Sequence, residues 1–216
     1  MKQPAPLPAL FRVALLAAIT VGALVSFSAA QGVGLVAMAS SSTGDTDVKL
    51  GAMAGLNPFG QQYAEAQEAA AKASRRATFS AIEAMGASRV VILLGLSASA
   101  SMVFLGALFI RWSLKAPRAA IARLLGAAAF GAAVFRTLDG AQELVIARRA
   151  AEATLKVLVA ANVPDAAGAS GVALGLLSFV SVAWTTLVVG LFLLLGTYFR
   201  SDRVRGLLEA LPDDEE

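Results

Sequence analysis

Residues 90–110 read VVILLGLSASASMVFLGALFI, a stretch of twenty-one uncharged residues between Arg89 and Arg111. A helix rises about 1.5 Å per residue, so about 20 apolar residues are enough to cross the hydrocarbon core of a bilayer. Two further uncharged stretches are longer, because thirty-two uncharged residues follow Arg12 and thirty-four precede Arg200. These three stretches predict three transmembrane helices.

A fourth and weaker segment lies between Arg123 and Arg136, which only twelve uncharged residues separate. It reaches the length of a span if Arg123 extends its guanidinium to the interface and the helix continues through Arg136, over residues 119–138. The sequence therefore predicts an all-α membrane protein with four transmembrane helices.

The composition agrees with this class, since 57% of the residues are hydrophobic, 15% are charged and the mean hydropathy is +0.71. The net charge is +3, but the basic residues are dispersed through the loops and form no stripe with interleaved aromatic residues. We expect a lipid bilayer as the partner of this surface, and no nucleic acid.

The distribution of Lys and Arg predicts the orientation of the chain in the membrane. The connection between the second and third segments carries four basic residues and no acidic one: Arg111, Lys115, Arg118 and Arg123. Basic residues also flank both ends of the chain: Lys2, Arg12, Arg200, Arg203 and Arg205. Because short basic loops stay in the cytoplasm, we expect a multi-pass protein of a bacterial inner membrane with both termini in the cytoplasm.

The first segment has two interpretations. A basic region over residues 1–12, an apolar core over 13–27 and the small residues 28–30 are typical of a signal peptide that is cut before Gln31. The apolar character continues to Met38, however, which gives the length of a retained anchor. Cleavage would leave three transmembrane helices, and either outcome exports the next loop.

Helical sequence continues beyond the second and third spans on the exported side. Asn57-Pro58 is a helix-start signature, and no breaker is evident between it and the second span, so one long helix is predicted. The third span continues to Asn162-Val163-Pro164, where the proline should end it. Leu144, Ala151 and Leu158 recur every seven residues, so these two extensions either pack on each other or remain separate amphipathic surface helices.

Glu68 with Lys72 and Glu152 with Lys156 have the spacing of helical ion pairs. The predicted segments are an N-terminal anchor or signal helix (1–39), an exported loop with a helix (40–88), a helical hairpin with a short basic cytoplasmic loop (89–138), an exported amphipathic helix with a loop (139–169), the last transmembrane helix (170–199) and a cytoplasmic tail (200–216).

The third helix carries the candidate ion or proton relay. Arg136, Asp139 and Glu143 stand at positions i, i+3 and i+7, so they share one helix face. If the membrane boundary lies near Ile146, these charges are inside the bilayer, where ionisable residues pair or conduct ions. If it lies near Leu138, they form a solvated turn with a local salt bridge.

Small residues at helical spacing predict close helix packing within the spans. The candidates are Gly95, Ser99, Gly131, Gly171 and Gly175.

The chain contains no Cys and no His, which excludes thiol chemistry, His-ligated haem and His- or Cys-ligated zinc. We therefore expect no catalytic residues, metal site or cofactor, and an enzyme is the least favoured class. The sequence favours a structural, assembly or interaction subunit of a membrane complex, with copies of itself or another membrane protein as its partner. The alternative is a small ion or solute transporter, or a channel-forming oligomer, that uses the charged residues of the third helix.

Overall fold

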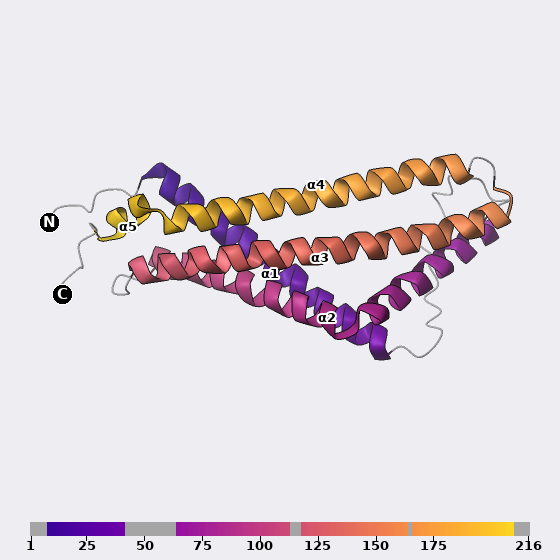
Figure 1. Ribbon diagram of the computed structural model, residues 1–216, viewed down its shortest axis with the longest axis horizontal. Helices are drawn as coiled ribbons and strands as arrows, with labels where there is room; N and C mark the ends of the chain where they lie inside the picture. Colours follow the sequence, from indigo (N-terminus) through magenta and orange to yellow (C-terminus); the bar gives the residue numbers. More distant parts are fainter. Residues whose placement is uncertain (1–7, 42–63, 113–117, 164–165, 210–216) are drawn as a thin grey trace. The chain divides into compact units, whose positions relative to one another are not determined.

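The computed structural model describes residues 8–41, 64–112, 118–163 and 166–209, and every element within those ranges is a helix (Figure 1). The helices are α1 (Ala9–Ser41), α2 (Ala64–Trp112), α3 (Arg118–Ala160), α4 (Ala166–Arg200) and α5 (Asp202–Glu209). In this part of the chain, α1 to α4 are long and apolar enough to cross a membrane. The predicted all-α membrane fold with four apolar helices is therefore confirmed. The predicted helix start at Asn57-Pro58 lies outside the described residues.

The chain divides into two compact units, and each of α1 to α4 contributes to both. The first unit comprises the residues up to Val33 together with Val91–Leu138 and Thr185–Glu216. The second unit comprises Gly34–Val90 and Asp139–Trp184.

In the first unit, α1 packs on α2 along a seam of small and apolar side chains. Phe11, Leu15 and Ala18 are buried at the spacing of a coiled-coil face, and the Phe11 ring makes an edge-to-face contact with Phe199 of α4 at 6.1 Å between ring centres. At Gly22 the helices are so close that an added Cβ would lie 2.9 Å from both the Ala100 carbonyl oxygen and the Phe104 backbone nitrogen. Only glycine therefore fits this crossing without moving a backbone.

Hydroxyl groups add a polar contact to the same seam. The Oγ atoms of Ser26 and Ser101 are 2.6 Å apart, and either can donate. Ser26 also donates to the carbonyl of Ser97, and Ser97 donates back to the carbonyl of Ser26, both at 3.4 Å. Such bonds satisfy hydroxyls that lipid would leave without partners.

Between α3 and α4, the first unit has a pair of closely packed glycines. A Cβ at Gly126 would lie 3.0 Å from the Gly196 carbonyl oxygen, and a Cβ at Gly196 would lie 3.2 Å from the Gly126 carbonyl oxygen. Arg200, at the end of α4, places its guanidinium 5.8 Å from the Phe130 ring centre, within the range of a cation–π contact.

The short helix α5 follows α4 after Ser201, whose hydroxyl accepts the backbone N–H of Val204 at 3.4 Å as an N-terminal cap. Val204 and Leu208 are buried. On the exposed side, Arg205 donates to Glu209 at 2.7 Å, and this hydrogen bond raises the pKa of Arg205.

In the second unit, α2 and α3 pack through a small apolar cluster formed by Ala70, Leu158 and Val163. Of the two interpretations of the helical extensions, the structure therefore shows packing rather than separate surface helices. Glu68 pairs with Lys72 at 3.2 Å, as predicted. The prediction for Glu152 was wrong, because it accepts from Arg148 one turn earlier, at 3.0 Å, and not from Lys156.

The prediction of an unbroken helix into the second span was also wrong, because α2 has a non-helical residue, Gly86, with φ 48° and ψ −130°. This is close to the mirror image of a type II turn, a conformation that glycine adopts readily and other residues rarely. No neighbouring atom lies within 4 Å of an added Cβ at Gly86, so its backbone, not packing, requires glycine.

α3 ends close to the place where the sequence predicts, through a cap made by Asn162. This residue is in the left-handed region with φ 52°. The Asn162 N–H donates to the carbonyl of Val159 at 3.0 Å, and the Val163 N–H donates to that of Leu158 at 3.1 Å. These two bonds form a Schellman motif, and the buried Leu158 and Val163 supply its apolar contact.

Candidate functional site

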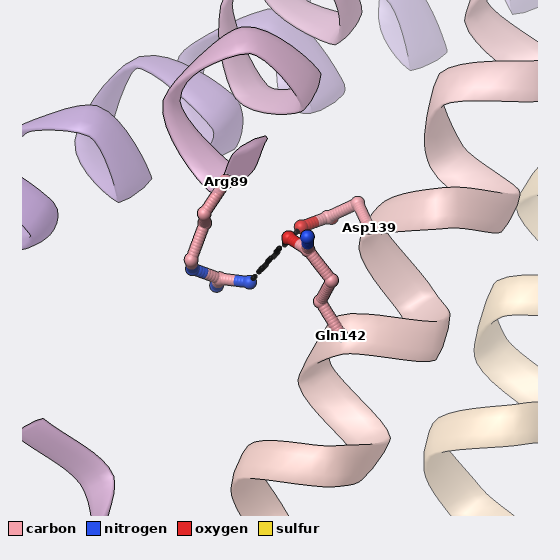
Figure 2. Close-up of polar contacts among 3 residues, drawn as sticks. All are labelled: Arg89, Asp139 and Gln142. Carbon is pink, nitrogen blue, oxygen red and sulfur yellow. Dashed lines mark hydrogen bonds and ion pairs between the residues drawn. The ribbon is translucent and has the colours of Figure 1, made fainter. Parts of the chain in front are cut away.

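A buried polar cluster in the second unit joins α2 to α3. It consists of Arg89 on α2 with Asp139 and Gln142 on α3 (Figure 2). Arg89 Nη1 donates to Gln142 Oε1 at 3.4 Å and lies 3.8 Å from Asp139 Oδ1. Arg89 is only 8% exposed and Asp139 only 2%, so both charges are removed from the surrounding solvent.

Arg89 and Asp139 stand at corresponding places on their two helices. About 20 residues cross the bilayer core. Counted from Ile110 back along α2, they end at Val91, just before Arg89 is reached. Counted from Ala119 along α3, they end at Leu138, directly before Asp139. If the spans begin at Ile110 and Ala119, the pair lies at the edge of the apolar core.

The cluster joins α2 to α3 through one ion pair and one hydrogen bond. The Asp139 carboxylate offsets the charge of Arg89, and the Gln142 amide oxygen accepts one of its five N–H groups. Within the described residues, Arg89 Nε is buried and makes no hydrogen bond, so the guanidinium keeps donor capacity.

The three sequence-derived relay residues all lie on α3, and none of them is fully exposed. Asp139 belongs to the buried cluster, and Glu143 is half-buried in the same unit. Arg136 is also buried, at 8% exposure, but belongs to the other unit. All three have interactions of their own, so none is an isolated charge.

The packing candidates divide into two groups. In the first unit, an added Cβ at Gly131 would lie 3.2 Å from Ser99 Oγ, and one at Gly95 would overlap the Phe135 ring. Both glycines therefore lie at contacts between α2 and α3. On α4, nothing lies within 4 Å of a Cβ added at Gly171 or Gly175, so these two face open space.

Sequence reasoning missed Arg89 and Gln142 as members of the site, although one signal for them was present. The basic connection between α2 and α3 is centred near residue 115, so an antiparallel hairpin places Arg89 opposite residue 141. Asp139 and Gln142 flank that position. Pairing the two helices across their loop would have identified the counter-charge.

Within the described ranges, no group of three or more Asp, Glu, His or Cys side chains is arranged to hold a metal ion. Comparison with protein-family models, with curated proteins and with solved structures returns no match to this chain.

Proposed function

We propose that this chain is a structural subunit that assembles a protein complex in a bacterial inner membrane. The observation that carries the proposal is an apolar helical surface that exceeds what a bilayer can cover. It belongs to α4, whose residues 166–199 contain no charge.

Helix lengths show the excess. α3 and α4 have 43 and 35 residues, which correspond to about 65 and 52 Å at 1.5 Å per residue. The apolar core is only about 30 Å thick. The overhangs of α2 and α3 carry charges and pack on each other, whereas that of α4 is apolar, and exposed apolar patches of this kind mark interaction sites.

The orientation that we propose places these overhangs outside the cytoplasm. Arg111, Arg118, Arg123 and Arg200 mark the opposite ends of α2, α3 and α4, and such residues stay in the cytoplasm. An exported surface without His or Cys, and with its charges mostly on helix exteriors, suits contact with another protein better than catalysis.

The proposal is tested by extracting the full chain from its native membrane into polymer nanodiscs and measuring the particle mass by native mass spectrometry. We expect each particle to contain this chain together with at least one further polypeptide, either a copy or another protein, in fixed ratio. Particles that hold one copy of this chain and no other protein would contradict the proposal.

A second function, ion or solute transport, is favoured by one observation, the burial of Asp139 against Arg89 at the edge of the span. The test is ion flux into proteoliposomes that contain the chain or its Asp139→Asn variant, with particle mass measured in parallel. Flux that the substitution abolishes at unchanged mass supports transport. Flux equal to that of empty liposomes, or flux that the substitution leaves unchanged, rejects this role for Asp139.

A further inference from the structure

Exposed arginines gather at one end of the first unit, where neighbouring helices meet. Phe11 near the start of α1 contacts Phe199 near the end of α4. A Cβ added at Gly106 of α2 would lie 3.4 Å from Leu125 of α3. The exposed arginines at these helix ends and on α5 are Arg12, Arg111, Arg123, Arg200, Arg203 and Arg205.

Carboxylates balance little of this charge in the described part of the first unit. Its acidic residues are Asp202 and Glu209, which both lie on α5 and both interact with Arg205. Glu209 Oε1 is 2.7 Å from Arg205 Nε. Arg123 and Arg200 form no ion pair with any residue that the structure describes. Their charges are therefore available to an external anion.

Arg200 is held against α3 by packing. Its Cγ would lie 2.6 Å from a Cβ added at Gly126, and its guanidinium lies 5.8 Å from the Phe130 ring centre. The face of an aromatic ring attracts a cation but supplies no negative charge. These contacts position the guanidinium and leave its charge uncompensated.

Arg123 lies on the same face of α3 as these contacts. It precedes Gly126 by three positions and Phe130 by seven, which is the spacing of residues that share a helix face. Arg203 follows Arg200 by three positions, on α5. Like charges close together repel each other, and an anion between them removes this repulsion. Phosphate suits arginine, because the planar guanidinium donates two parallel hydrogen bonds to its oxygens.

We propose that Arg123 and Arg200, together with Arg203, bind the phosphate of an anionic phospholipid. Basic side chains at the ends of transmembrane helices meet lipid headgroups directly. A zwitterionic headgroup also carries an ammonium group, which the surrounding arginines repel, so a lipid such as phosphatidylglycerol is preferred. Arginines that only set the orientation of a chain need no fixed position, whereas Arg200 has one. The proposal does not depend on the assembly function.

The first test measures lipid binding to the purified full chain in detergent by native mass spectrometry. Phosphatidylglycerol and phosphatidylethanolamine with identical acyl chains are added in turn. We expect phosphatidylglycerol to bind at least tenfold more tightly. Equal affinity for the two lipids overturns the proposal.

The second test compares two triple variants that remove the same charge. The site variant carries Arg123→Gln, Arg200→Gln and Arg203→Gln. The control variant changes three arginines of the second unit that form no ion pair with a described residue, namely Arg75→Gln, Arg76→Gln and Arg149→Gln. We expect the site variant to lose at least tenfold in affinity for phosphatidylglycerol and the control variant to lose none. Equal losses overturn the proposal, because net charge alone would then explain binding.

A single substitution guards against loss of packing in the site variant. Arg123 is exposed, so Arg123→Gln leaves the contacts of Arg200 with α3 in place. We expect at least a threefold loss of affinity for phosphatidylglycerol at unchanged helical circular dichroism. Unchanged affinity overturns the role of Arg123 and with it the proposed site.

Two further outcomes separate lipid from other anions. An excess of inorganic phosphate is expected to leave phosphatidylglycerol bound, since free phosphate has no acyl chains to contact the apolar helices, and displacement of the lipid overturns the proposal. Nanodiscs from native membranes test for an acidic protein. If the site variant loses a polypeptide there but keeps its affinity for phosphatidylglycerol, the lipid site is overturned while the assembly function stands.

Discussion

A buried guanidinium needs a counter-charge and hydrogen-bond acceptors, and two residues three positions apart on α3 supply them to Arg89. Asp139 provides the charge and Gln142 provides an acceptor. Removing one partner of a buried ion pair is far more costly than replacing both with apolar residues, because the remaining charge keeps its desolvation cost. This asymmetry can be measured.

Asp139→Asn is expected to lower the free energy of unfolding by about 3 kcal/mol, since it leaves Arg89 buried without its counter-charge. The double variant Arg89→Met with Asp139→Leu is expected to recover most of that loss. The measurement is reversible unfolding of the reconstituted chain in SDS titrations. Glu152→Gln is the control, because its ion pair is exposed and worth under about 1 kcal/mol. Equal losses in the Asp139 and Glu152 variants would show that Asp139 does not stabilise the contact between α2 and α3.

At position 86, glycine is required by the backbone conformation and not by neighbouring side chains. Gly86→Ala is expected to destabilise the chain by about 1–3 kcal/mol, because alanine is strained at φ 48° and ψ −130°. Gly34→Ala is the matched control, since an added Cβ there also meets nothing within 4 Å but the backbone is helical. It is expected to stabilise by about 0.5–1 kcal/mol. The same sign for both changes, in the same unfolding assay, would rule out backbone strain at Gly86.

At the scale of the element, helix ends and contacts differ in how far the sequence predicts them. The end of α3 was predicted from Pro164, which lies outside the described residues, yet the observed cap is made by Asn162, a residue known to tolerate the left-handed conformation. The break in α2 was not predicted, because a lone Gly86 in a helical pattern is usually tolerated within the helix. Arg89 was missed because pairing across two helices is not encoded in the periodicity of either.

The contact of α1 with α2 depends on Gly22. Gly22→Leu is expected to separate the helices, because its side chain meets backbone atoms of α2, whereas Gly34→Leu meets nothing within 4 Å. The measurement is disulfide formation between Ser26→Cys and Ser101→Cys, whose native Oγ atoms are 2.6 Å apart. We expect efficient linkage, at least a tenfold loss with Gly22→Leu and no loss with Gly34→Leu.

The same linkage experiment decides between an anchor and a cleaved signal. A retained anchor gives a disulfide within one intact polypeptide, whereas a cut before Gln31 gives two polypeptides that are held together only by the disulfide. Mass spectrometry before and after reduction distinguishes the two. A mass loss on reduction would contradict retention.

At the scale of the whole molecule, charge distribution predicts that both termini are in the cytoplasm. Green fluorescent protein fused to either end is expected to fluoresce, and alkaline phosphatase fused to either end is expected to remain inactive, because short basic loops resist export. Alkaline phosphatase inserted in the loop between α3 and α4 is the control and is expected to be active. The reverse pattern would contradict the proposed orientation.

Three of the four apolar helices were predictable from uncharged length alone, whereas α3 reached the length of a span only with Arg123 and Arg136 included. The contacts of the helical extensions were not predictable, since the packing of Ala70 on Leu158 and the exposure of the first half of α4 depend on which helices meet. The sequence thus gives the elements that enter the membrane more reliably than their contacts outside it.

The ion pair between α2 and α3 also has a consequence for biosynthesis. Asp139 follows Arg89 by fifty positions, and ribosomes add about 5–20 residues per second. For about 3–10 s after its synthesis, Arg89 therefore has no counter-charge, and α2 leaves the ribosome before the helix that neutralises it. The contact that this pair makes between α2 and α3 can therefore form only after the first half of α3 has been synthesised.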